Sequence, residues 1–328
     1  MARERVKCVM KKRLTVGVAT LLLLSACSSE TVTEEKAEKN SAEETTQKET
    51  TEGTSSFYKE VAKPSIDHIH GLGYPNGEGD VMIATHTGPV LYANGKWMES
   101  SAEKHDYMGF QAVKEGFYSS GHPSPNTDYE NPLGIIKSTN KGESFETFNF
   151  EGEIDFHYLA AGYDTNRLYV FNEMPTEKLA GGFYYTDDNG NVFSEMAVKG
   201  LQANQLSSLA AHPTTPAVMA IGTDQGAYIS ENSGQSVELV QKGSVSSLFF
   251  TENSLYVAIV ENGKPKLHQI DLRDTKVQEI ALPDEIAQEP ILYFAVSPVD
   301  SKEFTLVTTE NSIYQTVDGG TGWKNLLE

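Results

Sequence analysis

Near its end the chain reads TVDGGTGW, from Thr316 to Trp323, and the form of this octet recurs earlier in the sequence. Each copy has a hydroxyl residue, an Asp or Asn two positions later and a Gly two positions after that. In the clear copies an aromatic residue follows three positions further on. The other clear copies are Ser138–Phe145 and Thr186–Phe193, and a weaker copy, Ser230–Val237, ends in valine. The chain therefore contains a repeated unit.

The residue types of the octet are those of a tight turn between two strands. An Asp or Asn side chain accepts hydrogen bonds from its own loop, glycine adopts a positive φ, and the aromatic side chain enters a core. The four octet glycines, Gly142, Gly190, Gly234 and Gly320, are separated by 48, 44 and 86 residues. The last interval spans two periods, so one turn of this kind is absent near residue 277. A period of about 40 to 50 residues made of short strands predicts a β-propeller.

Short apolar segments between about residues 58 and 328 divide into six groups of four strands. We therefore predict an all-β, six-bladed propeller in which the octet joins the third and fourth strands of a blade. A seventh blade built from residues 50–66 is disfavoured, because that segment has few strand-forming residues. Successive strands alternate in direction, so the octets lie on one face and the start of each first strand on the other.

The octet resembles the Asp-box, or BNR repeat, of the sialidase and sortilin propellers, and the resemblance covers about residues 58–328. In that superfamily the box is a structural turn, so the resemblance implies the fold and says little about activity. Three segments, Asp67–Leu72, Ser120–Pro123 and Asp155–His157, also resemble a bacterial lipoprotein family labelled glycosylhydrolase-like. That label rests on the BNR repeats, and analogy of fold does not establish an activity.

The first 57 residues have the composition of a targeting and tethering segment. Residues 1–26 resemble an export signal, with six basic residues before an apolar run at 14–24 that is too short for a permanent transmembrane helix. Residues 24–27 read LSAC and resemble a bacterial lipobox, which implies acylation of Cys27. Residues 27–57 are rich in Ser, Thr, Glu and Lys, and we predict a disordered acidic linker. Together these segments predict a lipid-anchored protein on the extracytoplasmic face of the cell membrane.

The chain is strongly acidic. Its net charge of −20 becomes −25 when residues 1–26, with six basic residues and one acidic residue, are removed. Such a surface argues against nucleic acid or anionic lipid as the ligand and favours cations or neutral partners. We expect a small-molecule, glycan or protein ligand at the mouth of the propeller, membrane association through the lipid anchor, and a monomer.

Six of the eight histidines fall near strand ends on the face opposite the octets: His68, His70, His86, His105, His122 and His157. Aligning the first strands of the blades places Asp106 and Asp155 level with His68, and Met108 and His157 level with His70. Imidazoles with nearby carboxylates favour Zn²⁺ or Cu²⁺, and Met108 and Met174 near the same mouth would suit copper. The six histidines are therefore candidate metal ligands on blades 1 to 3. The alternative is a polar channel in which water satisfies the His and Asp side chains.

Two other functions are compatible with the residues. Asp106 and Asp155 would be the catalytic pair of a hydrolase acting on a neutral glycan, which needs two carboxylates beside the scissile bond. Sialidases bind the substrate carboxylate with three arginines, and beyond residues 1–26 this chain has only Arg167 and Arg273. Sialidase activity is therefore not expected, while glycosidase activity stays open. The third interpretation is a non-catalytic protein-interaction scaffold.

One connection in the second blade is unusually long, and it begins with a candidate metal ligand. The segment His122–Pro132 joins the second and third strands of that blade. Long loops in compact domains are often functional, so the segment is interpreted either as a cap over the site or as an ordered decoration of the blade edge.

Overall fold

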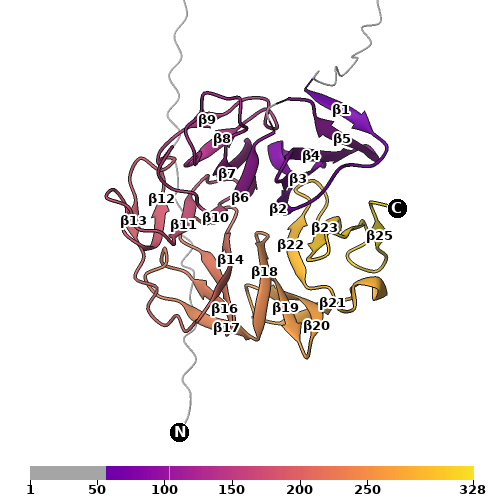
Figure 1. The fold of residues 1–328 in the computed structure, drawn as a ribbon. Helices are drawn as coiled ribbons and strands as arrows, with labels where there is room; N and C mark the ends of the chain where they lie inside the picture. Colours follow the sequence, from indigo (N-terminus) through magenta and orange to yellow (C-terminus); the bar gives the residue numbers. More distant parts are fainter. Residues whose placement is uncertain (1–56, 103) are drawn as a thin grey trace, which may run out of the picture. The chain divides into compact units, whose positions relative to one another are not determined.

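The computed structural model describes residues 57–102 and 104–328, in which the strands form six antiparallel sheets arranged in a ring (Figure 1). Each sheet is one blade, and its four core strands follow one another along the chain from the channel outward. This part of the chain is therefore the all-β, six-bladed propeller that the octet period predicts.

The strands of the first three blades are short. Blade 1 contains β2 (Ile69–Gly73), β3 (Val81–Thr85), β4 (Gly88–Ala93) and β5 (Lys96–Ser100). Blade 2 contains β6 (Asp106–Val113), β7 (Gly116–His122), β8 (Ile136–Ser138) and β9 (Glu146–Thr147). Blade 3 contains β10 (Tyr158–Ala161), β11 (Leu168–Asn172), β12 (Gly182–Thr186) and β13 (Ser194–Glu195).

The last three blades follow the same plan. Blade 4 contains β14 (Leu206–Ala211), β15 (Met219–Thr223), β16 (Gly226–Ser230) and β17 (Glu238–Lys242). Blade 5 contains β18 (Ser244–Phe250), β19 (Ser254–Glu261), β20 (Lys264–Asp271) and β21 (Val277–Ile280). Blade 6 contains β22 (Ile291–Val296), β23 (Phe304–Thr308), β24 (Ile313–Thr316) and β25 (Lys324–Asn325). Two 3₁₀ turns, η1 (Pro75–Gly77) and η2 (Asp284–Ile286), lie in connections.

One additional strand precedes the first blade. β1 (Tyr58–Val61) pairs antiparallel with β5, with Tyr58 opposite Ser100, and makes blade 1 a five-stranded sheet. The sequence analysis assigned no strand here. Since β1 extends an existing sheet, it does not begin a seventh blade.

The octets form the predicted turns in blades 2, 3, 4 and 6. In the last copy the Thr316 hydroxyl accepts hydrogen bonds from the N–H groups of Asp318 at 3.4 Å and Gly320 at 3.1 Å. The Asp318 carboxylate accepts from the N–H of Gly322 at 2.9 Å. Equivalent contacts are made by the hydroxyl residues of the other copies, Ser138, Thr186 and Ser230. Each octet thus satisfies its own backbone donors.

Blades 1 and 5 close their outer hairpins without an octet. In blade 1, Asn94 and Gly95 have φ of 52° and 76° and form the two-residue turn between β4 and β5. In blade 5, the Asp271 carboxylate accepts a hydrogen bond from the Arg273 N–H at 2.8 Å, and Thr275 has a φ of 58°. The turn that the glycine spacing leaves out near residue 277 is therefore replaced by a different one.

Octet glycines also allow neighbouring blades to approach closely. Gly234 has a φ of 74°, and a Cβ added there would lie 2.1 Å from Cε of Met196 in blade 3. Gly320 has a φ of 92°, and its added Cβ would lie 2.5 Å from Cγ2 of Ile280 in blade 5. Glycine at these two positions therefore serves both the turn and the packing of one blade on the next.

The ring closes through side-chain packing between blades 1 and 6. One hydrophobic cluster contains buried residues of both blades, among them Val90 and Val307. Trp97 Nε1 donates a hydrogen bond to the Leu326 carbonyl at 2.8 Å. Because the described sheets exchange no strand between the first and last blades, these contacts hold the two ends of the ring together.

The channel is a cavity of about 1110 Å³ bordered by all six innermost strands. β2, β6, β14, β18 and β22 each carry a register shift where they pair with the next strand. In β2 the shift lies between Ile69 and Gly71, so His70 is the extra residue of a bulge. His70, Met108 and His157, which the sequence alignment puts in one layer, all line this cavity.

Several predictions concern the start of the chain. The export signal at 1–26, Cys27 and all of the linker 27–57 except Phe57 lie outside the described residues. Across residues 57–102 and 104–328, helices long and apolar enough to cross a membrane are absent.

Candidate metal centre

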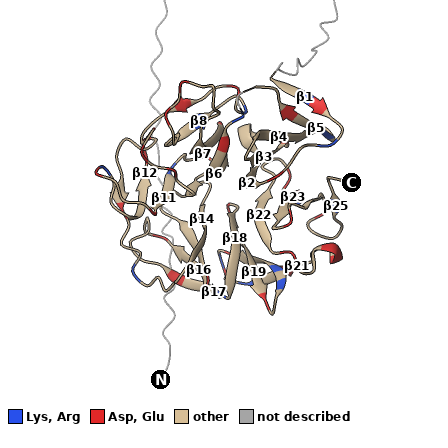
Figure 2. Ribbon diagram, in the orientation of Figure 1, with Lys and Arg blue, Asp and Glu red and all other residues tan. Residues whose placement is uncertain are grey.

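Three side chains from two blades meet at the mouth of the channel. His70 occupies the bulge of β2, His86 lies in the turn between β3 and β4, and Asp106 begins β6 in the next blade. The turn that carries His86 is held by Thr85, whose hydroxyl accepts from the Thr87 N–H at 3.1 Å and donates to the Gly88 carbonyl at 2.8 Å. Asp106 is the acidic residue of β6, a strand that carries a red segment in Figure 2. We call these three residues the His70 group.

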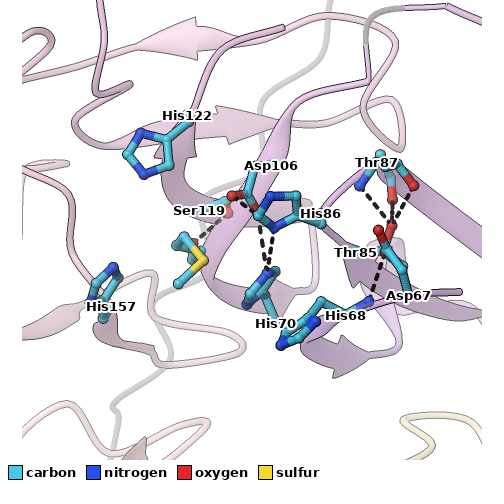
Figure 3. A network of polar contacts seen from close by, with 12 residues as sticks. Asp67, His68, His70, Thr85, His86, Thr87, Asp106, Ser119, His122 and His157 are labelled. Carbon is cyan, nitrogen blue, oxygen red and sulfur yellow. Dashed lines mark hydrogen bonds and ion pairs between the residues drawn. The ribbon is translucent and has the colours of Figure 1, made fainter. Parts of the chain in front are cut away.

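The side chains of the His70 group point toward one another (Figure 3). Nε2 of His70 lies 3.3 Å from Nδ1 of His86, and each of these nitrogens lies 3.3 Å from a different carboxylate oxygen of Asp106, Oδ1 for His70 and Oδ2 for His86. Ligand atoms at the usual bond lengths around a tetrahedral Zn²⁺ are about 3.3 Å apart. One donor atom from each of the three residues could therefore bind a single ion, and a fourth position would be left for another ligand.

Burial sets the protonation of the group. The side chains of His70 and Asp106 are only 15% and 11% exposed. Burial lowers the pKa of His70, although the charge of Asp106 acts in the opposite direction. Burial also raises the pKa of Asp106, and His70 and His86 oppose that rise. Oδ1 of Asp106 is buried and makes no hydrogen bond. A neutral imidazole and an oxygen without a donor are suited to a divalent cation.

A second cluster lies on blades 2 and 3 of the same mouth. One carboxylate oxygen of Asp155 lies 2.8 Å from Nε2 of His157 and 3.4 Å from Nε2 of His122. The other ring nitrogens face acceptors: Nδ1 of His122 lies 2.7 Å from Oδ1 of Asn131, and Nδ1 of His157 lies 3.3 Å from Glu173. The hydrogen bond with Asp155 is the main cause that raises the pKa of His157. We call His122, Asp155 and His157 the His122 group.

A pocket of about 590 Å³ lies beside the His70 group. His70, His86 and Asp106 line it together with His122 of the second group. His70 and Met108 line both this pocket and the channel cavity, so the two cavities share part of their walls.

Two predicted metal ligands, His68 and His105, belong to neither the His70 group nor the His122 group. His68 is exposed and stacks on His70 with ring centroids 5.9 Å apart, outside the His70–His86–Asp106 set. His105 is fully buried, with its Nδ1 accepting from the Ser124 N–H at 3.0 Å. This differs from the sequence-based expectation that His105 is a candidate metal ligand on the face opposite the octets. The physical reason is that the loop after His122 folds back over His105.

The ring of His105 packs edge-on against Tyr107, Tyr129 and Phe145 at 5.4 to 5.9 Å between centroids. The same loop contributes Pro123, Ser124 and Pro125 to the lining of the mouth pocket. The insertion at 122–132 thus forms part of the pocket wall and supplies Asn131 to His122. The sequence gives Asn131 no predicted role beyond its position in the long loop 122–132.

The two arginines of the described residues are used elsewhere. Arg167 forms a two-pronged ion pair with Asp187 in the blade 3 octet, at 2.6 and 2.7 Å. Arg273 pairs with Asp271 in the last turn of blade 5. Neither lines the mouth pocket.

Comparison with known families agrees with the octet geometry. A family model described as Sortilin-Vps10, for sortilin and neurotensin receptor 3, matches residues 134–281, which contain the octets of blades 2, 3 and 4. This chain is an Asp-box β-propeller. The match covers less than half of the chain, and no curated protein matches it.

Solved structures share the fold at low sequence identity. The extracellular domain of the B. thetaiotaomicron protein BT4673 is 14% identical with a TM-score of 0.51, covering 82% of this chain and 34% of that chain. A chain of a nidogen/laminin complex is 9% identical with a TM-score of 0.50, covering 73% of this chain and 86% of that chain. At such identities the likeness concerns the arrangement of the strands.

Proposed function

We propose that this Asp-box propeller is a lipid-anchored extracytoplasmic protein that binds Zn²⁺ or Cu²⁺ at the mouth of its channel. The observation that carries the proposal is the close approach of His70, His86 and Asp106, whose two ring nitrogens lie 3.3 Å apart and each 3.3 Å from one of the two Asp106 oxygens. The anchor is supported by the sequence alone, through the signal pattern of residues 1–26 and Cys27. The metal would be the positively charged partner of the buried Asp106 carboxylate.

The open fourth position gives the metal a binding role. Sites with three protein ligands and one exchangeable position take up water or a ligand from solution. Here that position faces the pocket of about 590 Å³, so the incoming ligand would be a small anion, a glycan hydroxyl or a side chain of a protein partner. Met108 lines the same pocket, and its thioether would favour copper over zinc.

A glycan hydrolase is the second candidate. Burial raises the pKa of Asp106, as in carboxylic acids that donate a proton during glycoside cleavage. Asp155 at the same mouth, with its side chain 15% exposed, would be the partner carboxylate. In this function the imidazoles would tune the two carboxyl groups without holding a metal.

Metal analysis of the purified full chain tests the proposal. Wild-type protein, Asp106→Asn and the control His268→Ala are loaded with Zn²⁺, desalted and assayed for bound metal. His268 lies on β20, where it contacts Gln241 and does not line the pocket. The control should match the wild type. Asp106→Asn should bind one ion fewer, with affinity at this site reduced by more than the roughly 100-fold known for outer-shell changes.

Equal zinc in all three proteins, or none in any, would rule out the His70 group as a metal site. Turnover of a neutral polysaccharide by metal-free wild type, abolished in Asp106→Asn, would instead establish the hydrolase. Absence of both metal and turnover would leave the interaction scaffold.

A further inference from the structure

We propose that the channel binds an uncharged saccharide on blades 4 to 6, through a wall that includes Ser207, Ser246, Ser247 and Tyr293. All four residues line the cavity of about 1110 Å³. This volume is slightly above the roughly 300–1,000 Å³ of typical small-molecule sites, so the cavity is large enough for a disaccharide. The wall shares no residue with the His70 group, so the inference goes beyond the proposed metal binding and does not require it.

Repeated bulges turn one residue of each of these blades into the channel. The register shifts in β14, β18 and β22 leave Ser207, Ser246 and Leu292 as the extra residues. All three line the cavity, as the bulge residue His70 does in β2. Val245, the residue before the bulge in β18, is instead buried in its blade. Bulges re-aim side chains and are frequent beside functional sites, so their repetition around one cavity indicates a built site.

Hydroxyl groups of this wall are available to a ligand. Ser247 follows the bulge of β18 and is only 5% exposed, yet it lines the cavity. Within the described residues its hydroxyl makes no hydrogen bond, and neither does that of Tyr293. Because buried polar groups are usually paired, these hydroxyls favour a ligand that supplies both donors and acceptors. Burial raises the pKa of Tyr293 to about 12, which keeps its phenol protonated as a donor.

The wall on blades 4 to 6 is uncharged at the level of the bulges. Apart from the histidines His70 and His157, the charged side chains that line the described cavity are Lys114, Asp164 and Glu252. All three lie in turns between the first and second strands of their blades, on the octet face, and Lys114 pairs with Asp164 at 2.9 Å. A charged ligand on this wall would lose hydration without gaining a counter-charge. In a chain with a net charge of −20, a neutral wall therefore favours an uncharged ligand.

Aromatic rings beside the hydroxyls favour a sugar over a peptide. Tyr158, Phe249 and Tyr293 all line the cavity, and the Tyr158 hydroxyl donates to the Leu206 carbonyl at 2.9 Å, which fixes its ring. The C–H faces of a saccharide pack on aromatic rings, while its hydroxyls exchange hydrogen bonds with serine and tyrosine. An extended peptide would instead need a regular strand edge to pair with, and the bulges interrupt that edge.

Calorimetric titration of the purified full chain with cellobiose, maltose and N,N′-diacetylchitobiose tests the inference. At least one of these neutral disaccharides should bind, and digalacturonic acid, which is anionic, should not. Tyr293→Phe should weaken binding by about 3- to 10-fold, the usual contribution of one hydrogen bond. Ser246→Asp should abolish binding, because the new carboxylate has no counter-charge in the wall. The matched control Tyr185→Phe should bind like the wild type, since Tyr185 lies against Arg167 and lines neither of the two cavities described.

Zinc content and circular dichroism are measured on the same variants, so that the two proposals fail separately. Tyr293→Phe should keep the zinc and the fold of the wild type. Wild type that binds none of the disaccharides would overturn the saccharide wall, whatever its zinc content. Binding left unchanged by both Tyr293→Phe and Ser246→Asp would place the sugar elsewhere and overturn it too. Equal affinity for digalacturonic acid, or binding of a blocked alanine tetrapeptide in place of the sugars, would overturn the assignment to an uncharged saccharide.

Discussion

Adding one methyl group at Gly234 should destabilise the propeller at a junction between blades. Gly234 has a φ of 74°, and a side chain in the left-handed region costs about 1–2 kcal/mol. The added Cβ would also lie 2.1 Å from Cε, 2.8 Å from Cγ and 3.0 Å from Cβ of Met196, and overpacking of this kind costs about 1–3 kcal/mol. Gly234→Ala should therefore lower the free energy of unfolding by about 2–5 kcal/mol.

Gly263 provides the matched control. It has a φ of 76°, and an added Cβ there meets nothing within 4 Å, so Gly263→Ala carries only the backbone cost. Urea denaturation of both variants measures the difference, which is the packing term. In a Met196→Ala background the contacts with Cε and Cγ are removed and only the 3.0 Å contact with Cβ remains, so the excess cost of Gly234→Ala over Gly263→Ala should fall. Equal destabilisation by the two alanines in the wild-type background would refute the claim that the octet glycine is required by blade packing.

Four further predictions follow from particular contacts. His105→Ala should lower the free energy of unfolding by about 1–3 kcal/mol, since the hydrogen bond from the Ser124 N–H to the buried His105 ring is lost, yet leave bound zinc unchanged by metal analysis. Burial lowers the pKa of His212, whose Nδ1 accepts two backbone hydrogen bonds, so below about pH 6.5 the unfolded chain binds a proton that the folded chain does not. Unfolding free energy should therefore fall between pH 7 and 5, less steeply in His212→Asn, and parallel slopes would contradict this. Trp97→Phe should cost about 1–3 kcal/mol in urea denaturation, because the buried Leu326 carbonyl loses its donor. Cys27→Ser should abolish incorporation of labelled fatty acid, and retained label would disprove the predicted anchor.

The number of blades was predictable because the hydrogen bonds that hold each octet turn are made within the octet itself. In the last copy the Thr316 hydroxyl accepts from the N–H groups of Asp318 and Gly320, and the Asp318 carboxylate accepts from the Gly322 N–H. Each of these contacts joins residues at most four positions apart, so the spacing of the residue types alone predicts the turn. The alignment of first strands predicts one layer for His70, Met108 and His157, which all line the channel cavity, whereas Asp106, aligned with His68, contacts His70. β1 was not predicted, because its pairing partner β5 is about 40 residues away and the segment before it is polar.

Sequence by itself determined what depends on neighbours along the chain: the turns, the strand alternation, the blade count and the face on which the histidines begin. Tertiary structure alone decided which of those histidines meet. The bulge in β2 redirects His70 toward Asp106 of another blade, and the loop after His122 buries His105 while it supplies Asn131. The physical reason is that side-chain direction at a bulge and burial under a loop are set by contacts between distant segments. No periodicity in the sequence records those contacts.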